Sequence, residues 1–106
     1  MMITAMPVEA QKFDGLKGVD PVIAYWGDVS PGAGYVTLIC YGRAWTAYFG
    51  AMGSHTIRDF FCRADTDYMV TKMYAPTLKE GRKYEKQLGQ IIDAVKDAMR
   101  ECVNPL

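Results

Sequence analysis

The residue types best suited to binding a soft metal ion or to acid–base chemistry near neutral pH are a single histidine and three cysteines in this chain. Cys40, His55 and Cys62 could be imagined as a metal site, but a fourth ligand at the usual spacing is missing and no C-x-x-C motif occurs. Both cysteines fall where the apolar pattern predicts burial or near burial, which favours reduced, packed thiols. His55 comes close to a predicted helix start, so we expect a loop or helix-start residue rather than a catalytic base. The sequence predicts no metal site and no cofactor.

Anion binding is the chemistry that the basic residues suggest. Lys79, Arg82, Lys83 and Lys86, here called the basic cluster, lie at the start of a predicted long helix. The helix dipole disfavours a cation there by about 0.3–1 kcal/mol. An anionic partner would explain this placement, but a solvated helix face explains it more simply. The formal net charge is zero, whereas a general nucleic-acid binder normally carries a basic excess. Nucleic acid is therefore the less favoured partner.

The carboxylates and the glycine-rich segment do not predict a catalytic site. The carboxylates fall at expected helix starts or on the polar face of the last helix, and no two of them share an apolar pocket of the kind that acid catalysis requires. Segment 50–54 precedes a helix start and could hold an anion, but it lacks the lysine of a phosphate-binding loop. We expect that the protein is not an enzyme.

The element on which the rest of the chain is organised is a central hairpin over residues 35–49. Two extended, aromatic-rich runs flank Gly42 and Arg43, which predicts a two-residue type II′ turn with glycine at the position of positive φ. The resulting register joins three apolar pairs: Cys40 with Trp45, Leu38 with Ala47, and Val36 with Phe49. A slip of one residue would bury threonines instead, so this face is predicted to be core.

The opposite face of the hairpin carries Tyr35, Ile39, Tyr41 and Tyr48. Tyrosines give large, rigid contact areas with a polar end, and binding energy is often concentrated on them. Two arrangements are open. Either the long helix packs over this face, or the face stays uncovered and contacts a host protein or a second copy of the chain.

The segments around the hairpin predict an α+β fold, in which a small antiparallel sheet of three or four strands is followed by two short helices and one long C-terminal helix. Before the hairpin we expect a short edge strand over residues 1–8, a loop over 9–18, a strand over 21–26 and a turn over 27–34.

Helix signals dominate the chain after the hairpin. Ser54 or Thr56 should cap the first helix, and a second short helix should follow Asp65–Asp67 and end before Pro76. The long helix should run from about Leu78 to Val103. Its apolar stripe has helical period: Tyr84, Leu88, Ile91, Ile92, Val95, Met99 and Cys102.

Length and composition indicate one soluble globular domain over residues 1–106. Half of the residues are apolar and 23% are charged. No apolar run approaches the roughly 20 residues of a membrane helix, and the amino terminus lacks the pattern of a signal peptide. We expect residence in the cytoplasm without membrane contact.

The chain resembles a family of small proteins from lambdoid bacteriophages and prophages over residues 39–53, Thr56–Ile57 and Phe60–Cys62. The similar features are a Cys-Tyr-Gly turn, a tryptophan followed by an aromatic pair, Gly-Ala-Met-Gly, and a helix with paired phenylalanines. Residues 67–70 also resemble the tyrosine-containing segment that follows in that family. The resemblance covers about a third of the chain and supplies no catalytic residues. It implies a phage or prophage origin and a bacterial host cytoplasm.

A phage origin favours binding over catalysis, because small phage accessory proteins without catalytic motifs commonly bind a host protein. We therefore expect a stoichiometric inhibitor or modulator of a host defence system, such as a CRISPR complex or a nuclease. The alternative is a nucleic-acid-binding accessory factor for phage recombination or replication. The candidate partner-binding residues are the four on the hairpin face and the four of the basic cluster: Tyr35, Ile39, Tyr41, Tyr48, Lys79, Arg82, Lys83 and Lys86.

Overall fold

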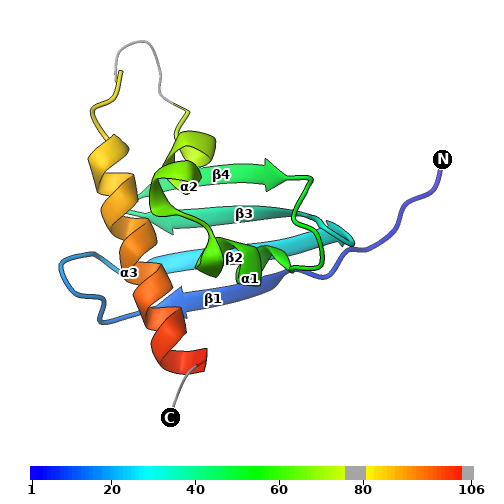
Figure 1. Cartoon of the computed structure of the whole chain (residues 1–106), viewed down its shortest axis with the longest axis horizontal. Helices are drawn as coiled ribbons and strands as arrows, with labels where there is room; N and C mark the ends of the chain where they lie inside the picture. The colour runs from blue at the N-terminus through cyan, green and yellow to red at the C-terminus, as the bar shows by residue number, and fades with distance from the viewer. Residues whose placement is uncertain (76–80, 104–106) are drawn as a thin grey trace.

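A computed structural model of the chain describes residues 1–75 and 81–103. A four-stranded antiparallel sheet is followed by three helices, the last of them long, which confirms the predicted α+β fold (Figure 1). The strands lie in the sheet in chain order: β1 (Glu9–Phe13), β2 (Val22–Ser30), β3 (Ala33–Cys40) and β4 (Arg43–Phe49). The helices are α1 (Ile57–Arg63), α2 (Thr66–Met73) and α3 (Glu85–Val103).

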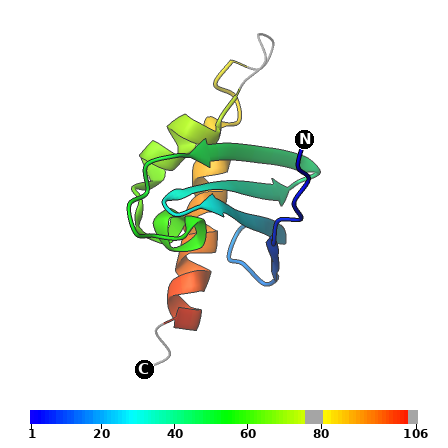
Figure 2. The ribbon, with the colours of Figure 1, turned by 90° about the vertical axis from the view of Figure 1, so that its right-hand side faces the viewer.

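The molecule has two layers, with all three helices on one face of the sheet (Figure 2). The sheet contributes alternating buried residues to the core: Val22, Ala24, Trp26, Val36, Leu38, Cys40, Trp45, Ala47 and Phe49. The helices contribute apolar stripes with helical period: Ile57, Phe61, Met69, Met73, Leu88, Ile91, Ile92, Val95 and Met99. Burial of this apolar surface is the main term that stabilises the fold. The predicted core face of the hairpin is therefore confirmed.

The hairpin between β3 and β4 keeps the predicted faces but not the predicted pairs. Its turn residues are Tyr41 and Gly42, with φ angles of 54° and 69°, and two positive φ values define a type I′ turn. Cys40 consequently pairs with Arg43, and Trp45 pairs with Leu38 rather than with Cys40. The predicted turn at Gly42–Arg43 was wrong. Tyr41 takes the first of the two left-handed positions, and residues other than glycine rarely adopt this conformation. The partner of Trp45 moves by two positions, and an even shift leaves each side chain on its own face.

The predicted edge strand over residues 1–8 was also wrong. The edge strand is β1, which lies inside the segment predicted as a loop. It is a polar strand, and its position depends on hydrogen bonds that apolar periodicity does not reveal. Gln11 Oε1 accepts hydrogen bonds from Trp26 Nε1 and from Arg58 Nε, both at 2.8 Å. The next strand, β2, extends to Ser30, so the turn predicted over 27–34 shrinks to Pro31–Gly32.

Side-chain caps begin α1 and α2. The hydroxyl of Thr56 accepts the backbone N–H of Asp59 at 3.2 Å, and the carboxylate of Asp65 accepts that of Tyr68 at 3.3 Å. These contacts satisfy backbone donors that have no partner inside the helix. Of the two residues predicted to cap α1, Thr56 is the cap, and the predicted cap in segment 65–67 before α2 is confirmed at Asp65.

The long helix begins at Glu85, later than predicted. Residues 81–84 form a turn, and 76–80 lie outside the described residues. Gly81 has a φ of 53°, which is outside the range of a right-handed helix, so the turn that begins with it is not part of α3. The hydroxyl of Tyr74 donates to the Gly81 carbonyl and accepts the N–H of Tyr84, both at 3.0 Å, and so holds the turn.

Gly89→Ala should raise the free energy of unfolding by about 1 kcal/mol, because alanine favours the helix interior over glycine by about that amount. An added Cβ would lie 3.7 Å from Val70 Cγ2, which is ordinary van der Waals contact. Urea denaturation measures the change. Gly81→Ala is the control, and it should destabilise the protein because its φ is positive. A loss of stability in Gly89→Ala would show that α2 and α3 pack too closely for a methyl group.

Candidate functional site

The sheet face opposite the helices exposes tyrosine rings. The exposed fraction is 49% for Tyr35, 46% for Tyr41 and 52% for Tyr48, and Ile39 is half-buried among them. The stripe of α3 packs against the other face of the sheet, so of the two predicted arrangements the uncovered one is present. The hairpin residues chosen from the sequence therefore do lie together on one surface.

Tyr25 and Ile23 of β2 extend this surface, and sequence reasoning did not include them in the site. They lie beside Thr37 and Ile39 because β2 pairs antiparallel with β3. The alternation of β2 already placed them on the face opposite Trp26, but only the strand order brings that face next to the hairpin. We call the combined surface the tyrosine face, which consists of Ile23, Tyr25, Tyr35, Ile39, Tyr41 and Tyr48.

Contacts within the tyrosine face hold its side chains in place. Tyr35 and Tyr48 are directly opposite in the β3–β4 register, and their ring centroids lie 4.9 Å apart with an interplanar angle of 49°. The hydroxyl of Thr37 donates to Thr46 Oγ1 at 2.9 Å, and Thr46 Oγ1 donates to the Val36 carbonyl at 3.0 Å. Cross-strand pairs of this kind stabilise a sheet and fix its surface.

The electrostatic character of the tyrosine face is close to neutral. Lys12, opposite Ile23 on β1, lies at the border of the face, and its ammonium is 3.6 Å from the Asp14 carboxylate. The hydroxyl of Tyr41 accepts the N–H of Asp20 at 3.3 Å. None of the six residues of the tyrosine face is charged, whereas binding to a phosphate backbone requires several cations.

The N-terminal segment limits the tyrosine face on one side (Figure 2). A Cβ at Gly27 would lie 3.0 Å from Met6 Cε and 3.7 Å from Val8 Cγ2, so these side chains cover the glycine. Gly27 pairs with Tyr35 across the β2–β3 ladder. The segment that was predicted as a strand therefore packs against the sheet surface instead of extending the sheet.

The basic cluster lies in the helix layer, so the structure does not join it to the tyrosine face. Lys79 is outside the described residues. Arg82 forms two hydrogen bonds with the Glu85 carboxylate, at 2.5 and 2.6 Å, which hold the pKa of Glu85 below its usual range. The ammonium of Lys83 is 5.2 Å from the centroid of the Tyr84 ring, and Lys86 is exposed. Two of the three described cations thus have partners within the chain.

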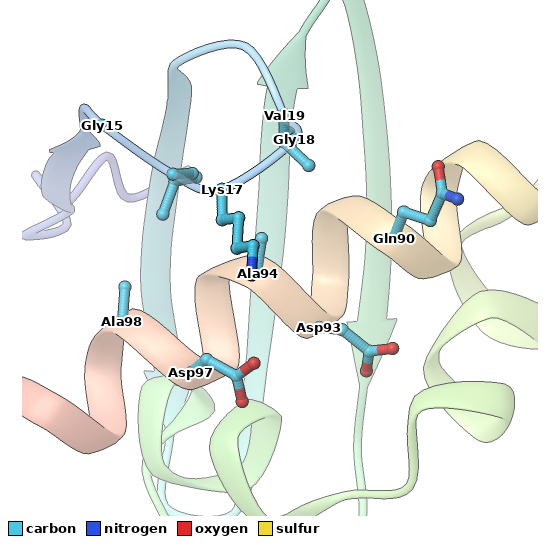
Figure 3. A pocket seen from close by; sticks show the side chains of 10 residues that line it. Gly15, Lys17, Gly18, Val19, Gln90, Asp93, Ala94, Asp97 and Ala98 are labelled. Atoms are coloured by element: carbon cyan, nitrogen blue, oxygen red, sulfur yellow. The ribbon is translucent and has the colours of Figure 1, made fainter.

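Two cavities border α3 on the helix side of the molecule. One cavity, of about 570 Å³, lies between α3 and the loop that contains Gly15, Lys17 and Gly18. Figure 3 shows the Lys17 side chain extending toward α3 beside Ala94. A second cavity, of about 510 Å³, lies between α2 and α3 and includes Lys86. Gln90 and Asp93 border both cavities.

Asp93 and Asp97, which border these cavities, have partners within the fold. Asp93 accepts a hydrogen bond from the Thr66 hydroxyl at 2.5 Å, and Asp97 lies 3.5 Å from Arg100. Lys96, which is buried, donates to the Ala64 carbonyl at 2.6 Å and to Thr66 Oγ1 at 3.2 Å. This network ties the junction of α1 and α2 to α3, so we assign it a structural role.

His55 and the cysteines are not brought together. The imidazole of His55 contacts Asp59 at 2.5 Å, and Arg63 donates to the same carboxylate at 2.9 Å. These two contacts, chiefly that with Arg63, lower the pKa of Asp59. Cys40, the last residue of β3, is buried in the core between the sheet and the helices. This burial, together with the nearby Asp20 charge, raises the pKa of its thiol. Within residues 1–75 and 81–103, no group of three or more metal-ligating side chains lies close enough to hold an ion.

Comparison with known protein families gave a match over nearly the whole chain. A family described as a phage family, Phage_phiTE_072, matches residues 1–103. No curated protein and no solved structure matches the chain. In the part of the chain that the structure describes, none of the helices has the length and apolar character that crossing a membrane requires.

Proposed function

The chain belongs to a phage protein family, and from this membership we propose that it is an accessory protein that binds a host protein stoichiometrically. The observation that supports the proposal is the tyrosine face, which the helices leave uncovered. We place its action in the cytoplasm of the bacterial host and its origin in lambdoid phages or prophages.

The tyrosine face has the chemical character of a protein-binding surface. Tyrosine is enriched among the residues that carry most of the energy of protein interfaces. Binding here costs little additional side-chain entropy, because Tyr35 and Tyr48 already contact each other on a rigid sheet. Their phenol groups give the polar contacts that such an interface needs at its rim.

The target class that we propose is a host defence complex, such as a CRISPR complex, or a defence nuclease. We propose inhibition by occupation of a surface on the target, without a catalytic step, because the feature that supports binding is an exposed sheet face whose rings contact each other. One molecule of inhibitor would then be needed for each molecule of target.

The alternative, a nucleic-acid-binding factor for recombination or replication, would depend on the basic cluster. Arg82 and Lys83 have partners within the chain, and net charge is zero. Replacement of Lys83 and Lys86 by glutamate separates the alternatives. It would abolish salt-sensitive binding to nucleic acid, whereas it should leave binding through the tyrosine face unchanged.

The double substitution Tyr35→Ser and Tyr48→Ser should weaken binding of the host partner at least about 100-fold, since an interface tyrosine of high energy contributes about 2 kcal/mol or more. The partner is captured on the immobilised wild-type protein from nuclease-treated host lysate, identified and purified. Its dissociation constant is then measured for each variant. The far-UV spectrum and melting temperature should change little, because both rings are half exposed.

The matched control is the double substitution Lys83→Glu and Lys86→Glu, which alters the helix layer and should retain wild-type affinity. Capture that survives loss of both tyrosines contradicts the proposal. Capture that depends on nucleic acid, or is lost in the lysine variant, favours the alternative function instead. Unfolding of the tyrosine variant would show that these rings belong to the core.

A further inference from the structure

The two edges of the sheet differ in their protection against strand addition. β1 has five residues and carries Glu9 and Lys12. β4 has seven residues, and Arg43 at its start is its one charged residue. Natural proteins protect edge strands with charges, prolines or bulges, because the unpaired backbone groups of an edge are a template for another strand. The pairing of β3 with β4 has no bulge, whereas that of β2 with β3 shifts between Asp28 and Ser30.

The outer edge of β4 offers a regular row of backbone groups. Among the described residues no strand pairs with this edge, which forms the end of the sheet in Figure 1. The type I′ turn makes Cys40 and Arg43 a hydrogen-bonded pair, and such pairs alternate along an antiparallel ladder. The N–H and C=O groups of Ala44, Thr46 and Tyr48 therefore point away from β3, toward the position of an added strand.

An aromatic cavity of about 260 Å³ lies beside the end of β4. Three of its side chains contact one another: the ring centroid of Phe49 is 5.3 Å from that of Phe60 and 6.1 Å from that of Tyr68. Lys72 is the one charged residue of its lining, and its ammonium lies 5.7 Å from the Tyr68 ring. Tyr48 borders this cavity and also belongs to the tyrosine face, so the two surfaces are continuous.

We propose that an extended segment of the host partner pairs with the outer edge of β4 as a fifth strand. Its backbone meets the outward groups of Ala44, Thr46 and Tyr48. One large apolar side chain enters the aromatic cavity, and an acidic side chain beside it pairs with Lys72. This inference rests on the proposed function and specifies how the partner is recognised.

The charge of the cavity distinguishes this occupant from a second copy of the chain. A second β4 would present the sequence Arg-Ala-Trp-Thr-Ala-Tyr-Phe, which contains no acidic residue to meet Lys72. It would also bring Arg43 to the edge. Charge complementarity therefore favours a partner strand that carries Asp or Glu over the symmetric pairing of two β4 strands.

A display library of random eight-residue peptides tests the proposal without the host partner. Peptides selected on the wild-type protein should carry a large apolar residue close to an acidic one and should bind as strands. A selected peptide should slow hydrogen exchange at the amides of Ala44, Thr46 and Tyr48. Thr46→Pro should weaken its binding at least about 30-fold, because proline removes an outward N–H without removing a backbone hydrogen bond to β3. Thr46→Ala is its control, because it loses the same hydroxyl contacts with Thr37 and the Val36 carbonyl but keeps the N–H and should bind as the wild type does.

Two further variants keep the test decisive. Lys72→Glu replaces an exposed side chain and should fold normally, and peptides selected on it should carry Lys or Arg where the wild type selects an acid. Tyr35→Ser, which is not on the edge, should leave peptide affinity unchanged while it weakens capture of the host partner. Host capture that is lost with Tyr35 and Tyr48 but retained in Thr46→Pro would overturn strand addition and leave the proposed function standing.

Three other outcomes also overturn the inference. The first is that no peptide is enriched. The second is that the enriched peptides ignore both Thr46→Pro and the charge at position 72. The third is that light scattering shows a dimer of the wild type that Thr46→Pro dissociates, which would make a second copy the occupant of the edge.

Discussion

Trp45→Ala should lower the free energy of unfolding by about 3–5 kcal/mol, as for other large aromatic residues deleted from a core. Trp45 is only 3% exposed and lies opposite Leu38 beneath the helices. Tyr48 is the control in the same strand, and Tyr48→Ala should cost clearly less because its ring is 52% exposed. Urea denaturation of the two variants gives the order, and similar losses would place both rings in one environment.

The indole N–H of Trp45 adds a second comparison. This buried donor has no hydrogen-bond partner among the described residues. A buried polar group without a partner destabilises a fold by about 1–3 kcal/mol. Trp45→Phe removes the donor along with part of the ring, so it should destabilise the protein far less than Trp45→Ala. A loss as large as that of the alanine variant would indicate that the N–H is bonded in solution.

Gly32→Ala should also destabilise the protein strongly. Gly32 has a φ of 77°, and a Cβ there would lie 2.8 Å from the carbonyl oxygen of Gly53. Its own carbonyl accepts the N–H of Met52 at 2.9 Å, so the backbone cannot move away freely. A left-handed alanine costs about 1–2 kcal/mol and overpacking about 1–3 kcal/mol, which together predict a loss of about 2–5 kcal/mol.

Gly42→Ala separates these two contributions. Gly42 has a φ of 69°, similar to that of Gly32, but no heavy atom lies within 4 Å of the position that an added Cβ would take. Its loss should be limited to the conformational part, about 1–2 kcal/mol. Calorimetric melting of both variants gives the difference. Equal losses would show that the segment 50–53 yields to the methyl group and that only the left-handed conformation matters.

The faces of the strands could be predicted from the sequence, but the pairing of the hairpin could not. Alternation in β3 and β4 assigns Leu38 and Trp45 to the core whichever turn joins the strands, because side chains repeat every two residues. The pairing depends on the turn type, and the turn uses a left-handed Tyr41. In the sequence only Gly42 stands out as a residue suited to positive φ near this turn. The second left-handed residue, Tyr41, could therefore not be predicted.

The position of β1 and the openness of the tyrosine face required the tertiary structure. Gln11 lies in a polar strand because Trp26 and Arg58, distant in sequence, both donate to it. The exposure of Tyr35 and Tyr48 depends on whether one sheet face has room for all the helices. Four strands make a face wide enough for α1, α2 and α3 together, and neither the width nor the crossing of the helices follows from local periodicity.

The order of the strands has a consequence for how the chain folds. Every ladder of the sheet joins strands that are consecutive in sequence, and two-residue turns connect β2 to β3 and β3 to β4. Short loops keep the entropy of closure small, and local contacts favour rapid folding. The sheet is therefore expected to assemble hairpin by hairpin. The helix α3 packs chiefly on the neighbouring α2 and joins the sheet last, because the strands that it covers lie far away along the chain. If the chain folds in this order, contacts of α3 chiefly determine the rate of unfolding, whereas contacts between β3 and β4 determine the rate of folding.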